Sequence, residues 1–232
     1  MLKIISLLLL STTVAYPQAL PANSAGAGTG LNLPDQMLIL ESKKSIKSGD
    51  VEPIDGTPYL SDEFQPGNVV TTKGVFTAIP MRYNIGEDYI EFKQKDITYI
   101  LDPSSKVKKV SISDKNFMVD DYTVKGKTRK GFYILLDSGK ITVLVKKKVL
   151  LHPAQPPKAL ESDGHHAKYE KLSDDFAYKL NGGPITDISS VKKMIEVLPD
   201  HQEELKKFVS KERISKNQTD LAKLAHYYNQ LQ

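Results

Sequence analysis

The fold is decided by residues 132–145, which read Phe132-Tyr133-Ile134-Leu135-Leu136-Asp137-Ser138-Gly139-Lys140-Ile141-Thr142-Val143-Leu144-Val145. Two runs of aromatic, leucine and β-branched residues flank a short loop, which is typical of an antiparallel β-hairpin. The loop is expected to span Asp137 to Gly139. A hairpin loop of this length usually ends in a left-handed residue, so the pattern predicts that conformation for Gly139.

Short apolar runs of the same kind recur on both sides of this hairpin, and turn residues rather than helices separate them. They are found at 75–85, 89–93, 97–101, 107–113, 117–119, 122–125, 167–172 and 176–180. Strands joined by turns form antiparallel meanders. We therefore expect an α+β protein whose residues 37–182 form a curved antiparallel meander of about eight to eleven strands, resembling half a barrel and covering a single core.

The apolar period lengthens to nearly four residues after Gly182-Gly183-Pro184, which predicts a helical segment over residues 183–232. Three short helices are expected to pack on or beside the sheet, since a short helix needs a surface for its apolar stripe. Asp200 and Glu203 have the spacing of a reciprocal N-terminal cap. Asn217 lies where it would cap the last helix, which is expected to begin near Thr219.

The first residues have the composition of a secretory signal. Lys3 precedes the apolar run Ile4 to Leu10, and small residues lead to Ala15. This predicts a signal peptide over 1–15, with Ala19 as an alternative cleavage point, and a disordered spacer rich in proline and glycine over 16–36. The chain contains no cysteine, so no lipoprotein anchor is expected, and no apolar run is long enough to span a bilayer. The expected location is periplasmic or secreted.

Composition excludes several kinds of chemistry. Without cysteine there can be no disulfide, thiol catalysis or thiolate metal site. The formal net charge is +4, and loss of Lys3 leaves 31 basic against 28 acidic residues, or +3. The charges are interspersed, which argues against a nucleic-acid partner. The one basic run noted, Lys146-Lys147-Lys148, interrupts an apolar strand and is interpreted as protection of a sheet edge or as a bulge.

No pattern predicts a catalytic, cofactor-binding or metal-binding residue. The best metal candidate is Asp163-Gly164-His165-His166, with His152, His201 and His226 elsewhere, but a zinc site needs ligands at defined spacing. The serine and lysine segment 42–48 lacks the context of a nucleophile. The acidic pairs Asp62-Glu63 and Asp120-Asp121 would diverge along a strand. Gly182-Gly183-Pro184 lacks the pattern of a phosphate-binding loop.

Arg82-Tyr83 is the polar pair of greatest interest, because Arg82 is one of only three arginines in the chain. It could clamp an anionic ligand. An internal salt bridge, or a side chain laid across the sheet, is the favoured interpretation.

Several stretches resemble a group of exported proteins of unknown function from Gram-negative bacteria. They are Gly56-Thr57-Pro58-Tyr59-Leu60-Ser61-Asp62-Glu63-Phe64-Gln65-Pro66-Gly67, Ile79-Pro80-Met81-Arg82-Tyr83-Asn84-Ile85, Tyr89-Ile90-Glu91-Phe92, Leu198-Pro199-Asp200-His201 and the closing stretch Leu224 to Leu231 with Tyr227-Tyr228-Asn229. The resemblance implies export and the order of β followed by α. It implies no activity and no functional residue.

The leading functional hypothesis is a non-enzymatic envelope protein that binds a partner protein or an apolar ligand through its curved sheet. The alternatives are a secreted hydrolase whose carboxylates converge only in the fold, and a structural accessory of the cell surface. The ligand, its binding residues and the oligomeric state are left open.

Overall fold

The computed structural model describes residues 43–44, 54–71, 74–94, 97–103, 107–124, 126–156 and 164–231. The predicted signal peptide at 1–15 and the predicted spacer at 16–36 both lie outside these described residues.

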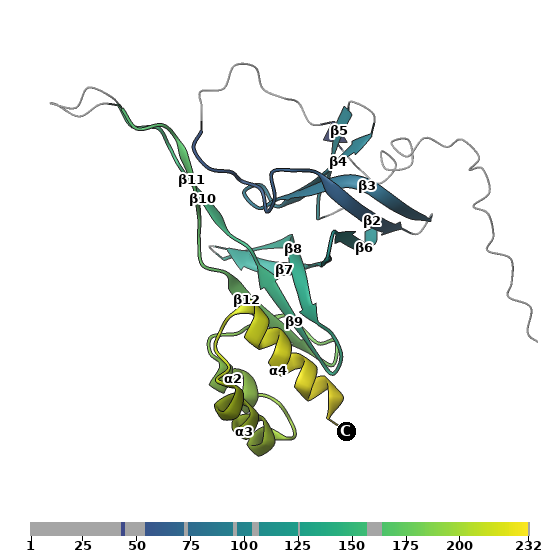
Figure 1. Cartoon of the computed structure of the whole chain (residues 1–232), viewed down its shortest axis with the longest axis vertical. Coiled ribbons are helices and arrows are strands. Elements are labelled where there is room, and N and C mark those ends of the chain that lie inside the picture. Colours follow the sequence, from purple (N-terminus) through teal and green to yellow (C-terminus); the bar gives the residue numbers. More distant parts are fainter. Residues whose placement is uncertain are drawn as a thin grey trace, which may run out of the picture. The chain divides into compact units, whose positions relative to one another are not determined.

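Most strands join one antiparallel sheet of eleven strands, in the order β1-β5-β4-β3-β2-β6-β7-β8-β9-β12-β13 (Figure 1). Their bounds are β1 Lys43–Lys44, β2 Gln65–Thr71, β3 Val75–Asn84, β4 Tyr89–Gln94, β5 Ile97–Leu101, β6 Val107–Ile112, β7 Lys115–Val124, β8 Lys127–Asp137, β9 Ile141–Lys146, β12 Asp175–Leu180 and β13 Thr186–Asp187. The predicted curved antiparallel meander is confirmed. It departs from chain order at three places: β1 pairs with β5, β6 pairs with the far edge of β2, and β12 pairs with β9.

Two strand predictions need correction. Residues 115–124 form one strand, β7, where two shorter strands were expected. Residues 167–172 do not extend the large sheet: β11 (Lys168–Lys171) pairs with β10 (Val149–His152) in a separate two-stranded sheet. Alternation within a strand is a local property of the sequence, whereas the choice of pairing partner depends on the path of the whole chain.

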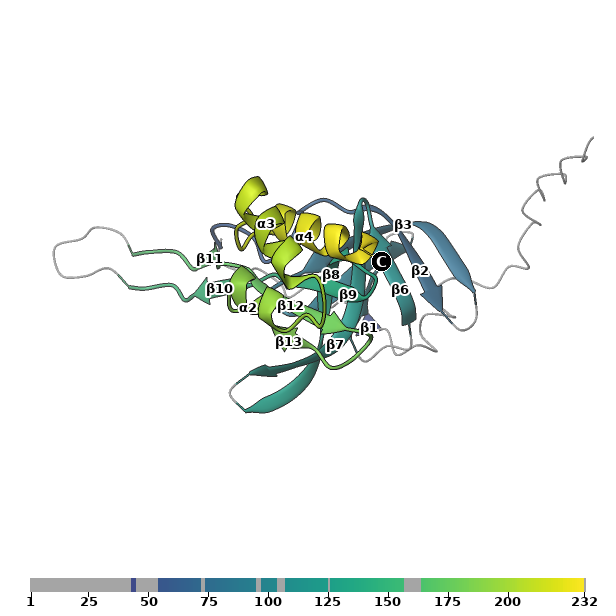
Figure 2. The same ribbon diagram turned by 90° about the horizontal axis from the view of Figure 1, so that it is seen from below.

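The helices follow the sheet, as predicted. They are α2 (Val191–Glu196), α3 (Gln202–Glu212) and α4 (Gln218–Gln230). α4 packs against β8 and β9, while α3 contacts both α2 and α4 (Figure 2). The predicted cap of α4 is confirmed, since Asn217 accepts a hydrogen bond from the backbone N–H of Asp220 at 2.9 Å. The predicted cap at Asp200 is wrong: α3 begins after His201, which is left-handed and makes no side-chain capping bond.

The predicted left-handed conformation of Gly139 is also wrong. Among the described residues, the glycines with a positive φ are at 56, 74, 126 and 182. Gly139 is needed for space instead, because a Cβ atom there would lie 2.5 Å from the side-chain Cγ of Asn229. Asn229 on α4 accepts a hydrogen bond from Ile141 N and donates one to Ile141 O, each at 2.9 Å. It also donates to Asp137, so the side chain fastens α4 to the β8–β9 hairpin.

The core occupies both faces of the central strands. The larger cluster joins apolar side chains of the sheet, among them Val143 and Val145 of β9, to Leu221 and Leu224 of α4. A smaller cluster forms around Tyr133, Leu144 and Ala177. Because side chains alternate between faces along a strand, Leu144 lies on the face of β9 opposite Val143 and Val145. The expectation of a single core beneath one face is therefore wrong for these strands.

Candidate binding site between β6 and β7

The large sheet opens between β6 and β7. These strands pair at only three positions, Val110 with Phe117, Ser111 with Asn116 and Ile112 with Lys115. β7 pairs with β8 at nine positions, from Asn116 to Val124. Beyond Phe117, β6 and β7 therefore diverge, and the ribbon separates at this point (Figure 1). Residues 107–109 and 118–123 keep strand neighbours on one side only among the described residues.

A cavity of about 380 Å³ lies where the two strands diverge. It is lined by Val107, Lys108, Lys109, Val110, Asn116, Phe117, Met118, Val119, Phe132, Leu135 and Ser138. Phe117 and Phe132 are buried, whereas Lys108 and Lys109 are exposed. The lining combines apolar and aromatic side chains with two lysines and includes no carboxylate. We call this feature the β6–β7 cleft.

Two of the aromatic side chains that line the cleft, Phe117 and Phe132, pack against Tyr83. The ring of Tyr83 on β3 lies edge-on to Phe117 and Phe132, with ring centroids 5.3 and 6.1 Å apart. The Tyr83 hydroxyl donates a hydrogen bond to Asp88 Oδ1 at 2.6 Å. Burial, followed by the negative charge of Asp88, raises the pKa of the Tyr83 phenol well above its usual range. The phenol is therefore a neutral hydrogen-bond donor at physiological pH.

An ion pair connects these three aromatic side chains to the end of β9. Lys146 Nζ donates to Asp88 Oδ2 at 2.5 Å and to the carbonyl oxygen of Phe132 at 3.1 Å. The backbone N–H of Phe132 in turn donates to Asp88 Oδ1 at 3.2 Å. The two charged side chains are only 12% and 15% exposed. Burial lowers the pKa of the Lys146 ammonium, and the neighbouring Asp88 carboxylate opposes that shift.

Gly131 makes room for this ion pair. A Cβ atom on Gly131 would lie 2.5 Å from Lys146 Nζ and 2.6 Å from Asp88 Oδ2. The Lys146 ammonium also lies 4.5 Å from the ring centroid of Tyr122. The close approach of β8 to the two charges therefore depends on the missing side chain.

The interpretation of Lys146-Lys147-Lys148 as edge protection is wrong. β9 lies between β8 and β12, so it is not an edge strand. Lys147 forms an ion pair with Asp174 at 2.8 Å, and Lys148 forms one with Asp175 at 2.7 Å. All three lysines are thus held by aspartates.

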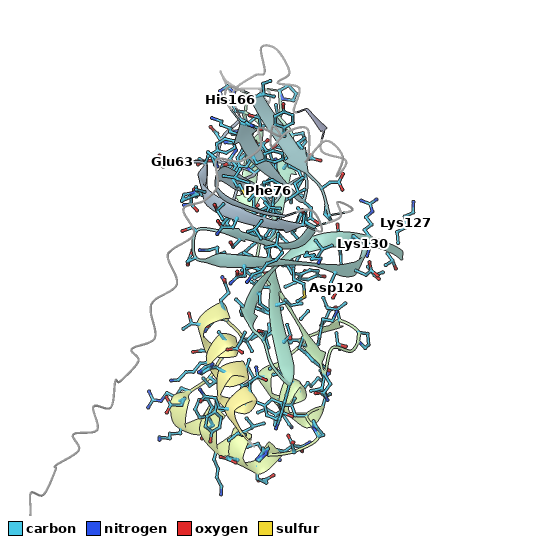
Figure 3. All side chains as sticks on the ribbon, turned by 90° about the vertical axis from the view of Figure 1, so that its right-hand side faces the viewer. Glu63, Phe76, Asp120, Lys127, Lys130 and His166 are labelled. Carbon is cyan, nitrogen blue, oxygen red and sulfur yellow. The ribbon has the colours of Figure 1, made fainter. Side chains whose placement is uncertain are left out.

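A group of exposed basic residues lies on β8, away from Lys146-Lys147-Lys148. Lys127, Arg129 and Lys130 are exposed on β8, at the projecting end of the β7–β8 hairpin, where Figure 3 shows Lys127 and Lys130. Sequence reasoning missed this group because the basic residues are separated by glycine and threonine in Lys125-Gly126-Lys127-Thr128-Arg129-Lys130.

Arg82 forms an internal salt bridge, as the favoured interpretation expects. Its Nε lies 2.7 Å from Glu91 Oε2, and the Glu91 side chain is only 4% exposed. The guanidinium carbon lies 3.6 Å from the ring centroid of Tyr59 and 4.5 Å from that of Phe64. The Tyr59 hydroxyl also donates a hydrogen bond to Glu91. Burial of Tyr59, followed by the negative charge of Glu91, raises the pKa of the Tyr59 phenol to about 12. Since Glu91 and the two rings already surround the guanidinium, it is poorly placed to clamp an external anion.

The remaining predicted candidates do not converge. His152 contacts Glu170, His201 contacts Glu204 and His226 contacts Asp137. His165 pairs through its backbone with Gln155, while Asp163 and most of segment 42–48 lie outside the described residues. Within the part of the chain that is described, no group of three His, Asp or Glu side chains could hold a metal ion.

The acidic pairs are occupied by local contacts. Asp62 accepts a hydrogen bond from Thr57, Asp120 pairs with Lys179, and Asp121 pairs with Lys130 at 3.4 Å. Glu63 and Arg82 both line a second cavity, of about 190 Å³, which is separate from the β6–β7 cleft lining in that neither residue belongs to it. Gly182-Gly183-Pro184 links β12 to the short strand β13 and does not begin a helix.

The fold and cleft define an open antiparallel sheet, split between two strands and followed by a short helical segment. No protein-family model, curated protein or solved structure matches the chain. Among the described residues, no helix has the length and apolar character that crossing a bilayer requires.

Proposed function

We propose that this chain is a non-enzymatic exported protein that binds a partner protein by accepting an extended segment of it in the β6–β7 cleft. The observation that carries the proposal is the divergence of β6 and β7 after three paired positions around a cavity with an apolar lining. A strand laid beside either edge would gain backbone hydrogen bonds, and alternate side chains would enter the cavity.

The geometry favours a polypeptide over a small apolar ligand. Along a strand, backbone N–H and C=O groups point alternately toward the two neighbouring edges. On the cleft side of residues 107–109 and 118–123, such groups face no strand in the described structure. A lipid-like ligand would fill the cavity but leave these groups without a partner, whereas an extended peptide would satisfy both requirements.

The lining also suggests the character of the partner segment. Val107, Met118 and Val119 offer apolar surface, and burial of such surface contributes about 25 cal/mol per Å². Lys108 and Lys109 add positive charge at the opening, and no carboxylate lines the cavity to offset it. A segment that alternates apolar residues with an acidic residue would complement this surface.

Export to the periplasm or the cell exterior belongs to the same proposal. It rests on the amino-terminal sequence.

The proposal is tested by screening displayed random peptides of about ten residues, long enough to form one strand, against the purified protein. We expect the selected peptides to alternate apolar residues with at least one carboxylate. They should lose binding to a Met118→Arg variant, because the new charge lies in the apolar lining. Ile97→Arg is the matched control, since Ile97 is an exposed apolar residue of a different strand and is not part of the cleft lining.

Selected peptides that bind Met118→Arg as well as the native protein would overturn the cleft as the binding site. If binding is lost in Met118→Arg, photocrosslinking from position 118 in the native envelope would identify the natural partner and the segment that reaches the cleft.

A further inference from the structure

A polar cavity of about 310 Å³ lies beside the smaller core cluster, on the face of β8 and β9 opposite the main core. Three aspartates, two tyrosines and a lysine contribute to its lining. They are Asp121, Asp175, Asp187, Tyr122, Tyr133 and Lys146. None of the residues that line the β6–β7 cleft lines this cavity. We call it the aspartate cavity.

Tyr133 brings an unused hydroxyl to the lining of this cavity. The residue is only 5% exposed, yet its hydroxyl forms no hydrogen bond with any described residue. Burial, followed by the negative charge of Asp187, raises the pKa of the Tyr133 phenol well above its usual range. The phenol is therefore neutral at physiological pH and lies near Asp187 without bonding to it. Since a buried phenol usually has a hydrogen-bond partner, this hydroxyl is available to a bound molecule.

The free charge in the lining is negative. Lys146 does not offset it, because its ammonium is already bound to Asp88 and to a backbone carbonyl. Asp121 and Asp175 belong to ion pairs in which the aspartate is 56% and 60% exposed, and such pairs are weak. Asp187 forms no ion pair within the described part of the chain. An anion would therefore be repelled, whereas a cation would find a free carboxylate.

The lining also offers apolar surface. Asp187 on β13 pairs in register with Ala177 on β12, a buried residue of the lining. Ile185 adds a second aliphatic side chain. β12 separates Asp187 from β9, the strand that carries Lys146, so the free carboxylate and the lysine are not on neighbouring strands. A short aliphatic chain would contact this surface while a charged end reached Asp187.

We propose that the aspartate cavity binds a small aliphatic amine, whose ammonium group donates hydrogen bonds to the carboxylate of Asp187 and to the hydroxyl oxygen of Tyr133. The cavity has the volume of a site for a small molecule. This site is independent of the β6–β7 cleft, because Tyr133 and the cleft residue Phe132 are neighbours on β8 and face opposite sides of the sheet.

Titration of the purified protein with 1-aminopentane at pH 7, followed by amide chemical shifts, tests the proposal. We expect saturable binding with a dissociation constant of about 1–10 mM, which is reasonable for so few atoms. Pentan-1-ol has the same chain length without the charge. It should bind at least about tenfold more weakly, because it offers no counter-charge to Asp187.

Two conservative variants locate the site. Asp187→Asn should weaken binding of 1-aminopentane by at least about tenfold, and Tyr133→Phe by about three- to tenfold, since it removes one hydrogen-bond acceptor. The matched controls are Asp114→Asn and Tyr99→Phe, which change an exposed aspartate and a buried tyrosine outside the cavity lining. Both should bind as the native protein does.

Three results would overturn the proposal: no saturable binding of 1-aminopentane, equal affinity for pentan-1-ol, or native affinity in either cavity variant. Melting curves confirm that the variants are folded. The comparison of the amine with the alcohol uses the native protein alone, so it does not depend on how any variant folds.

Discussion

Lys146 Nζ lies 2.5 Å from Asp88 Oδ2, and this ion pair joins the end of β9 to the turn between β3 and β4. β3 belongs to the part of the sheet on the β6 side of the cleft, and β9 belongs to the part on the β7 side. The ion pair, together with the contacts of Tyr83 with Phe117 and Phe132, therefore connects the two parts of the sheet. Direct pairing between β6 and β7 is limited to three positions.

The first prediction concerns Asp88→Asn. This substitution leaves the nearly buried Lys146 ammonium without its carboxylate, so we expect a loss of about 2–4 kcal/mol in the free energy of unfolding. Urea denaturation measures it. The control is Asp114→Asn, which breaks a pair whose aspartate is 76% exposed and should change stability by no more than about 0.5 kcal/mol. Equal effects of the two variants would contradict a structural role for the Asp88–Lys146 pair.

Arg82→Ala should destabilise the protein by about 3 kcal/mol, because it leaves the buried carboxylate of Glu91 without its positively charged partner. The double variant Arg82→Ala with Glu91→Gln should recover part of that loss, since the amide carries no charge. A thermodynamic cycle of the four proteins measures the coupling. Arg82 lies outside the lining of the cleft, so peptide binding should be unchanged in any variant that remains folded. Loss of binding alone, with stability intact, would return Arg82 to the list of ligand-binding candidates.

Alkaline pH should destabilise the fold through its tyrosines. The pKa of Tyr59 is raised from 10.0 to about 12, and that of Tyr83 is raised further, mainly by burial. A phenol whose pKa is higher in the folded state stabilises the protein fully below its unfolded pKa, near 10. That contribution is lost as pH rises through the folded value. Stability should therefore fall above about pH 10.

Absorbance of the phenolate measures this titration. Tyr59 should ionise only near pH 12, and Tyr83 only as the protein unfolds, because burial raises the pKa of both phenols. Tyr83→Phe should remove one residue from those that ionise on unfolding. Ionisation of all tyrosines in a single step near pH 10, with the fold intact, would be incompatible with the buried Tyr83–Asp88 contact.

Asn229→Ala should loosen α4 from the β8–β9 hairpin. The side chain makes three hydrogen bonds, two to the backbone of Ile141 and one to Asp137. We expect a loss of about 1–3 kcal/mol and faster hydrogen exchange at the Ile141 amide. Gln230→Ala, a change of an exposed neighbour at the end of α4, is the control. An Ile141 amide as protected in Asn229→Ala as in the native protein would show that α4 is held by apolar packing alone.

The sequence predicts the strands well where alternation and turns coincide, as at 89–93 and 97–101, because these signals are local. The hairpin at 132–145 is correct in its pairing, but Gly139 has a different role from the one expected. The sequence gives no sign that Asn229, ninety residues away on a helix, would occupy the space over the glycine. The order of strands around β2 likewise depends on a crossing that no local pattern encodes.

The cleft could not be predicted from the sequence. It arises because β6 and β7 pair at only three positions and then diverge, so both strands continue after their mutual pairing has ended. Lysines 146–148 show the same limit. The run of three lysines suggests an exposed edge. Each lysine instead forms an ion pair with an aspartate that is distant from it in sequence: Asp88, Asp174 or Asp175.

The central claim is that the open edges of β6 and β7 receive an extended segment. The most direct measurement is amide-resolved hydrogen exchange of the protein with and without a peptide selected in the display screen. Binding should slow exchange at amides within 107–109 and 118–123 and leave the amides of β10 unchanged. Tight binding that protects amides elsewhere, with none of these slowed, would contradict the claim.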